Sequence, residues 1–234
     1  MLLHNLSPVA WRSRKVATGT QTGAGYGRSL ILDRAPKRLF DLSVALSCLF
    51  LLLPLFVLVA FLVWAVDRKS PFYSHLRLGR GGKTFGCLKF RSMRMNGDEI
   101  LRRHLAENPA AMAEWTQNRK LKNDPRITII GHVLRKTSLD ELPQLWNVVR
   151  GDMSLVGPRP IVVGEISRYG RYFEHYCAVR PGITGLWQVG GRNDVSYRRR
   201  VAYDVTYSRA RSCAMNVKII AYTVPSVLFQ RGSY

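Results

Sequence analysis

The chain has 234 residues, and its 36 lysines and arginines against 15 aspartates and glutamates give a formal net charge of +21. This length suits one domain with a tail and excludes two large domains. The charge favours an anionic partner, namely nucleic acid, an anionic membrane or a phosphorylated substrate, whereas 47% hydrophobic residues exclude a disordered basic binder. The four cysteines form no CxxC pair, so we expect free thiols and neither a disulfide framework nor a zinc site.

The first 35 residues have the composition of a flexible N-terminal tail. Residues 1–35 combine glycine, serine and threonine with scattered arginines and show no apolar periodicity. Their glycines lack the preceding strand and the following Lys-Ser/Thr pair of a phosphate-binding loop. The segment also lacks the apolar run that a signal peptide requires.

The next segment, residues 36–69, is the most apolar part of the chain. Residues 42–66 form a run of 25 residues without a charge, which is long enough to cross a bilayer as a helix. Pro54 lies near the middle, where a proline removes a backbone hydrogen bond and kinks a helix. Basic residues flank both ends, which suits two cytoplasmic ends. Two interpretations stay open: a re-entrant helix broken at the proline, or an ordinary kinked span.

The region that follows predicts a small hairpin and a pair of helices. Residues 71–93 contain two extended stretches around a glycine-rich turn at 79–82, which is the pattern of a β-hairpin. Residues 98–120 favour a helix that is interrupted at Asn108-Pro109. The fold class is therefore α+β, mainly helical with a small β-hairpin.

Three shorter segments complete the predicted elements. Residues 127–136 favour a short strand or the start of a helix, and residues 139–150 favour a short helix with Leu139, Leu142, Leu145 and Trp146 towards one face. Residues 213–229 are amphipathic and too short to span a membrane. An interfacial helix and a helix packed on the core are equal alternatives for this last segment.

The tetrapeptide Ser138–Glu141 combines a helix-start signal with two adjacent carboxylates. As a capping box, Ser138 is the N-cap and Glu141 lies three residues later. As a reactive site among many arginines, one acid is suited to attack phosphorus and the other to hold a divalent cation. Asp124, Asp194 and Asp204 are further acids, which are either ligands or, by default, salt-bridge partners.

Two later motifs present arginine on a constrained backbone. Val156–Pro160 places Arg159 between two prolines, and a rigidly held guanidinium suits bidentate phosphate binding. A proline-rich turn with a solvated arginine is the equal alternative. Arg180–Arg192 combines terminal arginines with glycines that permit a close backbone approach, and its Trp187 either stacks on a base or, more commonly, fills a core.

Together these motifs resemble the bacterial sugar transferases, the monotopic polyprenyl-phosphate phosphoglycosyl transferases. The resemblance covers about Lys37 to the C-terminus, and the ending Arg231–Tyr234 looks most like the galactosyl-1-phosphate transferases that initiate exopolysaccharide synthesis. The motifs that carry it, in chain order, are FRSM at 90–93, DPRIT at 124–128, LRKTSLDELPQL at 134–145, VGPRP at 156–160 and RPGITGLWQVGGR at 180–192.

The resemblance implies a transfer of sugar-1-phosphate from a UDP-sugar to undecaprenyl phosphate, with release of UMP. In the family's dyad, Asp140 would form a covalent phosphosugar intermediate and Glu141 would hold Mg²⁺. The family is anchored at the cytoplasmic face of the bacterial inner membrane by a re-entrant helix broken at Ser-Pro, which here reads Leu53-Pro54. Residues 70–234 would then be the cytoplasmic catalytic domain with an interfacial C-terminal helix.

The same resemblance assigns partners and a substrate-binding set. We expect a UDP-sugar, undecaprenyl phosphate and membrane lipid as partners and no nucleic acid, and a homo-oligomer is compatible with the sequence. Arg159 would contact the nucleotide. The full set of basic residues expected to bind the substrates is Arg91, Arg126, Arg135, Lys136, Arg159, Arg180 and Arg192.

Three other functions are compatible with parts of the sequence. A membrane-tethered nucleic-acid binder would explain the charge, but the chain shows no zinc finger or clear helix-turn-helix motif. A catalytically inactive scaffold is disfavoured because Asp140 and Glu141 are both intact. A glycosyltransferase that forms a glycosidic bond would release UDP instead of UMP.

Overall fold

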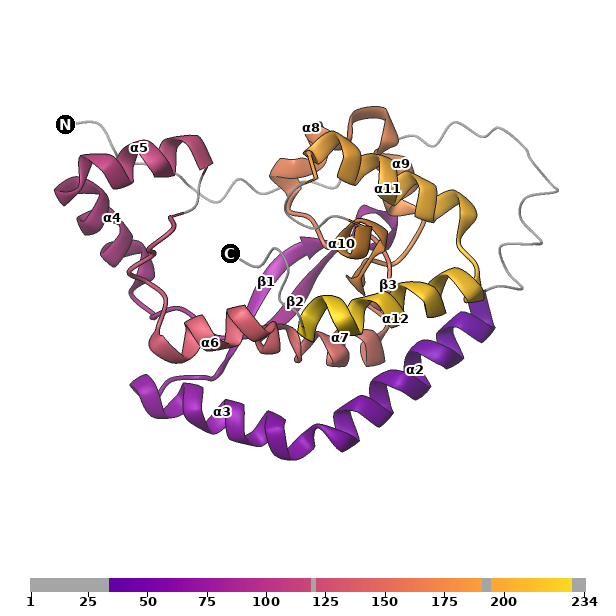
Figure 1. Cartoon of the computed structure of the whole chain (residues 1–234), viewed down its shortest axis with the longest axis horizontal. Helices are drawn as coiled ribbons and strands as arrows, with labels where there is room; N and C mark the ends of the chain where they lie inside the picture. Colours follow the sequence, from indigo (N-terminus) through magenta and orange to yellow (C-terminus); the bar gives the residue numbers. More distant parts are fainter. Residues whose placement is uncertain (1–33, 119–120, 191–194, 229–234) are drawn as a thin grey trace.

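A computed structural model describes residues 34–118, 121–190 and 195–228. The expected tail, except for residues 34–35, lies outside the described residues, as do Arg192, Asp194 and the ending Arg231–Tyr234. The described chain is mainly helical with two small two-stranded sheets (Figure 1), which confirms the predicted balance of helix and strand.

The apolar segment forms two helices that meet at a sharp bend. Helix α2 (Arg34–Leu51) and helix α3 (Leu53–Asp67) are separated by Leu52, and their axes are bent by 64°. Pro54 lies in the first turn of α3, where its missing N–H would have no intrahelical partner. The predicted break near the proline is confirmed. In the described part of the chain no single helix is long and apolar enough to cross a membrane. By length and composition only, α2 and α3 taken together are long and apolar enough.

The bent pair runs along one edge of the molecule (Figure 1) and keeps a large apolar surface exposed. Only a few of its residues pack inward, among them Val59 and Val63, which are each 4% exposed and contact Phe90 and Leu134. A partner that excludes water is therefore favoured on the other side. The exposed apolar side chains of the pair include Leu39, Leu46, Phe50, Leu51, Leu53, Val57, Leu58, Phe61 and Val66.

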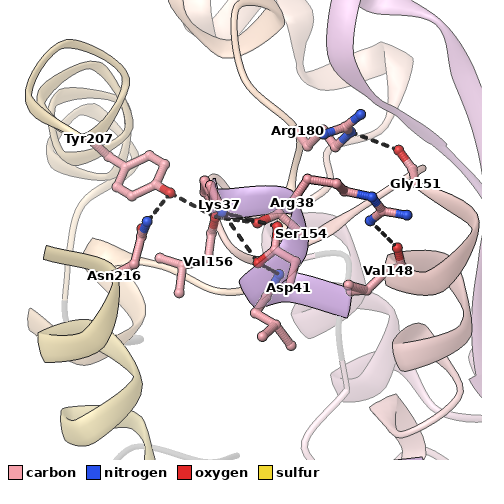
Figure 2. Close-up of polar contacts among 11 residues, drawn as sticks. Lys37, Arg38, Asp41, Val148, Gly151, Ser154, Val156, Arg180, Tyr207 and Asn216 are labelled. Carbon is pink, nitrogen blue, oxygen red and sulfur yellow. Dashed lines mark hydrogen bonds and ion pairs between the residues drawn. The ribbon is translucent and has the colours of Figure 1, made fainter. Parts of the chain in front are cut away.

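Polar contacts near its N-terminus fasten α2 to the body of the protein (Figure 2). The buried Asp41 pairs with Lys37 and accepts a hydrogen bond of 3.2 Å from the backbone N–H of Leu155. The Lys37 ammonium also donates to the Ser154 hydroxyl. Because a buried charge is costly when it is unpaired, these contacts hold α2 in one place on the strand that contains Ser154.

The predicted hairpin is confirmed. Strand β1 (Phe72–Leu78) pairs antiparallel with β2 (Thr84–Phe90), with Phe72 opposite Phe90 and Leu78 opposite Thr84. The connecting turn includes the short 3₁₀ helix η1 (Arg80–Gly82), in which Gly81 has a φ of +70° that favours glycine.

The helices after the hairpin agree with the sequence in part. The interrupted helix is confirmed as α4 (Gly97–Glu107) and α5 (Pro109–Asn118), which stand away from the body in Figure 1. Residues 127–136 mostly enter helix α6 (Ile129–Thr137), so the strand alternative is wrong. Thr128 explains the helix, because its hydroxyl accepts a hydrogen bond from the Gly131 N–H and caps the first turn.

A second sheet, which the sequence did not predict, joins the start of the VGPRP motif to the RPGITGLWQVGGR motif. Strand β3 (Ser154–Val156) pairs in parallel with β4 (Gly182–Thr184). Between them the chain forms η3 (Val163–Glu165), α8 (Ile166–Tyr169), η4 (Gly170–Tyr172) and α9 (Phe173–Cys177).

The last helices pack around this sheet. Helix α10 (Leu186–Gly190) is followed by α11 (Tyr197–Ala210) and α12 (Cys213–Leu228). On α12, Ile219 is 2% exposed in the core, whereas Val217 and Tyr222 are 55% and 65% exposed. The core-packing prediction is thus confirmed for one face of α12, and the interfacial role of the other face stays a prediction. All four cysteines are free, as expected.

Candidate active site

The two adjacent acids lie on a tight turn between helices. Ser138 ends α6 with a left-handed φ of 59°, and Asp140 and Glu141 follow in the 3₁₀ helix η2 (Leu139–Glu141). The Ser138 side chain makes no capping hydrogen bond there, so the capping-box prediction is wrong. The reason is that Ser138 is used as the C-terminal cap of the preceding helix, where its backbone N–H donates to the Arg135 carbonyl at 3.3 Å.

The predicted helix over 139–150 is correspondingly shorter. Helix α7 (Gln144–Arg150) begins after Pro143, and the acids precede it. Leu145 is buried as predicted, but Trp146 is 51% exposed and does not share the buried face. The turn therefore presents the two acids to the hairpin instead of placing them in the first turn of α7.

Lys89 on strand β2 joins the two acids. Its ammonium nitrogen lies 2.7 Å from Glu141 Oε1 and 3.4 Å from Asp140 Oδ2, while Asp140 is 8% exposed. The sequence did not single out this lysine. The available signal was a charged residue within an otherwise apolar strand, directly before the FRSM motif.

Arg159 approaches the same acids from the VGPRP motif. Its Nη2 atom lies 3.8 Å from Glu141 Oε1, and its side chain is 47% exposed, so it can also reach a ligand. The backbone around it is fixed because the Gly182 N–H donates to the Pro158 carbonyl at 2.8 Å. A Cβ atom at Gly157 would lie 2.3 Å from the Arg180 carbonyl oxygen, so only glycine permits this approach. The geometry agrees with rigid presentation of the Arg159 guanidinium.

Electrostatics distinguish the two acids. Burial raises the pKa of Asp140, the charge of Glu141 adds to this rise, and Lys89 and Arg135 oppose it. Burial also acts to raise the pKa of Glu141, but Lys89, Arg159 and Arg77 outweigh it and lower that pKa. Paired acids with diverging pKa values are typical of groups with different chemical roles. Glu141 is therefore the more readily ionised of the two acids, and Asp140 is the more basic carboxylate.

Two of the other expected binding residues lie on the helix that leads into the acids. Arg135 donates to the Ser92 hydroxyl at 2.9 Å and is near enough to Asp140 to lower its pKa. Lys136 is exposed beside it.

Other expected residues make structural contacts elsewhere. Arg91 is 8% exposed and pairs with Asp67 at 2.6 Å, at the end of α3. Arg126 pairs with Asp124 at 2.6 Å and lies 5.2 Å from the centre of the Trp115 ring. The salt-bridge interpretation of Asp124 is confirmed.

The last motif also contributes mainly to packing. Arg180 donates to the Gly151 carbonyl at 2.9 Å (Figure 2). Gly151 follows the C-terminal end of α7, whereas the acids precede its N-terminal end. Trp187 is 5% exposed, and the Arg200 guanidinium lies 4.5 Å from its ring centre. The core interpretation of Trp187 is confirmed.

Asp140 and Glu141 are also the candidate ligands of the expected Mg²⁺ ion. The described residues contain no group of three or more His, Cys, Asp or Glu side chains suited to a metal. Mg²⁺, however, is usually held by one or two carboxylates together with substrate phosphates and water. Glu141, with Asp140 beside it, fits that donor set.

The chain is similar to known proteins along most of its length. The family model for bacterial sugar transferases matches residues 32–230. The exopolysaccharide production protein ExoY of Sinorhizobium fredii is 52% identical over 198 residues, which cover 85% of this chain and 88% of that protein. The UDP-galactose-lipid carrier transferase of Erwinia amylovora is 54% identical over 202 residues, which cover 86% of this chain and 42% of that protein.

A third relative gives the same result. The undecaprenyl-phosphate galactose phosphotransferase of Salmonella typhimurium is 49% identical over 202 residues, which cover 86% of this chain and 42% of that protein. The chain thus spans most of ExoY but less than half the length of the two longer relatives. With a family match over most of its residues, the chain belongs to the bacterial sugar transferase family.

Proposed function

We propose that the chain transfers a sugar-1-phosphate from a UDP-sugar to undecaprenyl phosphate and releases UMP. As a member of its family the chain is an enzyme, a phosphoglycosyl transferase. The names of the relatives support UDP-galactose as donor and an undecaprenyl lipid as acceptor. The name of ExoY supports a place in exopolysaccharide production, as the first membrane step of repeat-unit synthesis.

The observation that carries the proposal is a pair of adjacent acids, Asp140 and Glu141, whose pKa values are shifted in opposite directions. Lys89 contacts both acids, and Arg159 contacts Glu141. An Asp140 oxygen attacks the sugar-bearing phosphorus of the donor, and the bond from that phosphorus to the oxygen bridging to UMP breaks. The electron pair leaves with UMP, and the sugar phosphate stays on Asp140 as an acyl phosphate. An oxygen of undecaprenyl phosphate then attacks the same phosphorus and regenerates the Asp140 carboxylate.

The basic residues supply charge for these two steps. Phosphoryl transfer depends mainly on positioning and on neutralising anionic oxygens, and it needs little acid–base chemistry. Lys89 is placed to hold the ionised dyad, and the exposed guanidinium of Arg159 is placed to bind the diphosphate. Mg²⁺, when bound at Glu141, would supply further positive charge to the diphosphate.

The bent helix pair suits an enzyme with a lipid acceptor. We place its exposed apolar residues in the cytoplasmic leaflet of the bacterial inner membrane, as a re-entrant segment. Both of its ends contact the same folded body, α2 through Asp41 and Leu155 and α3 through Asp67 and Arg91. That arrangement supports a dip into one leaflet, because a complete span would separate the two ends by the membrane.

A half-reaction tests the proposal. Purified enzyme with Mg²⁺ and UDP-galactose labelled in the β-phosphate, without acceptor lipid, should release at most one UMP per enzyme and retain the label on the protein. Adding undecaprenyl phosphate should then move the label into the lipid phase. The covalent intermediate would be contradicted if UMP formed in the presence of acceptor while no label was ever retained on the protein. A screen of other UDP-sugars would establish the donor.

A further inference from the structure

A buried asparagine connects the element that follows the acids to the strand that carries Lys89. Asn147 lies on α7, and it is 0% exposed. Its Oδ1 atom accepts a hydrogen bond of 2.9 Å from the Leu88 backbone N–H, and its Nδ2 atom donates one of 2.8 Å to the Gly86 carbonyl. A third contact of 3.2 Å joins Nδ2 to Asp152 Oδ2.

The Asn147 carboxamide makes the hydrogen bonds that a neighbouring strand would make, along the edge of β2 that is not paired with β1. One edge of β2 is paired with β1, whereas the Leu88 N–H and Gly86 carbonyl point to the other edge. Backbone groups two residues apart point the same way in a strand, so one amide can satisfy a donor and an acceptor together. Among side chains of this length only asparagine offers both functions, since aspartate accepts without donating when it is ionised.

We propose that Asn147 is a positioning residue that sets the place of Lys89 against Asp140 and Glu141. Lys89 directly follows Leu88, and the two acids precede α7 by a few residues. One buried side chain therefore fixes the separation between the strand that carries the cation and the turn that carries the anions. This inference rests on the proposed function of the acids.

Removal of the Asn147 carboxamide should reduce kcat by displacing Lys89 from Asp140 and Glu141. The loss should therefore depend on Lys89, whereas a loss caused by poorer packing alone would occur with or without that lysine. A displacement of about 1 Å in a catalytic group can cost up to about 10²-fold in rate.

The test uses two variants and a matched control. Asn147→Ala removes both hydrogen bonds, and Asn147→Asp keeps the shape while losing the donor to Gly86. Asn216→Ala is the control, because Asn216 is also buried, at 4% exposed, but contacts the Tyr207 hydroxyl at 2.9 Å, on α11. Full-length proteins are assayed at matched folded fractions, with the Tm of each measured in the same buffer.

We expect both Asn147 variants to lose kcat, while Asn216→Ala lowers only the Tm. Combined with Lys89→Met, Asn147→Ala should cost little more than Lys89→Met alone, because both changes remove the same interaction. An unchanged kcat in both Asn147 variants, or fully additive losses in the double variant, would overturn the inference. Absence of UMP release by the unmodified enzyme would instead contradict the proposed function.

Discussion

Asp140 and Glu141 are neighbours in the chain, yet their surroundings shift the two pKa values in opposite directions. The difference arises from geometry, because Lys89 is nearer to Glu141 than to Asp140, and Arg159 also faces Glu141. A buried carboxylate that is more basic than usual donates electrons to phosphorus more readily once it is ionised. The two pKa shifts therefore distinguish the acids in the direction that their proposed roles require.

Replacing Asp140 with asparagine tests the nucleophile. Asp140→Asn keeps the volume of the side chain and removes the attacking oxygen anion, so we expect transfer to fall by about 10³-fold or more. Thermal unfolding should change little. Glu99→Gln is a control, because Glu99 is an exposed acid that pairs with Arg103 at 3.6 Å on α4. Near-normal UMP release by Asp140→Asn would exclude Asp140 as the nucleophile.

Asp204 makes a second residue-level prediction, which concerns stability. Asp204 is 2% exposed and accepts a 2.6 Å hydrogen bond from the Tyr169 hydroxyl. Burial raises its pKa to about 7, against the opposing effect of that hydrogen bond. The folded protein thus binds a proton that the unfolded chain, with an ordinary carboxyl pKa of about 3.9, releases. This contribution to stability is present at low pH and is lost as pH rises through about 7.

The variant Asp204→Asn isolates that effect, because asparagine keeps an acceptor for Tyr169 and does not ionise. The Tm of the unmodified protein should fall relative to that of Asp204→Asn as pH rises from 5 to 8. Parallel Tm curves for the two proteins over this range would show that Asp204 does not titrate as its burial indicates.

At the level of elements, local signals predicted more than distant ones. The proline in an uncharged run predicted the bend between α2 and α3, and a glycine-rich turn predicted the hairpin. Both follow from backbone restrictions that a few neighbouring residues impose. By contrast, the pairing of β3 with β4 joins three-residue strands far apart in the chain, and such strands are too short to leave a periodic pattern.

The site shows the same limit. Asp140, Glu141 and Arg159 were found from motifs, but Lys89 was not, because its meeting with the acids depends on how β2 packs against α7. The capping-box prediction for Ser138 is wrong for a related reason. The pattern of serine followed by glutamate three residues later fits a capping box, yet the same serine ends α6 in a left-handed conformation, and its place in the chain alone does not decide between these uses.

The bent helix pair makes a prediction about membrane topology. Single cysteines at Ala35 and Ser70, in a chain whose native cysteines are replaced by serine, mark the two ends of the pair. Because Asp41 and Asp67 tie both ends to one body, a membrane-impermeant maleimide added to intact cells should label neither end. Both should react after lysis, which is the control. Periplasmic labelling of one end would instead establish a complete span.

At the scale of the whole molecule, a net charge of +21 and an exposed apolar edge occur together, and both suit the membrane-bound enzyme that we propose. Part of the positive charge surrounds the dyad, where phosphate groups of both substrates would meet. Other arginines, such as Arg91 and Arg126, form structural ion pairs. The charge excess is thus divided between substrate binding and the fold, and composition alone does not separate the two.

The most direct measurement follows the β-phosphorus of the donor. UDP-galactose labelled with ³²P in the β-phosphate is incubated with the enzyme, undecaprenyl phosphate and Mg²⁺, and the aqueous and lipid phases are then separated. Transfer of a sugar-1-phosphate predicts label in the lipid and unlabelled UMP in water. Labelled UDP in water, with an unlabelled glycolipid, would mean that the enzyme transfers the sugar alone and would contradict the mechanism through Asp140.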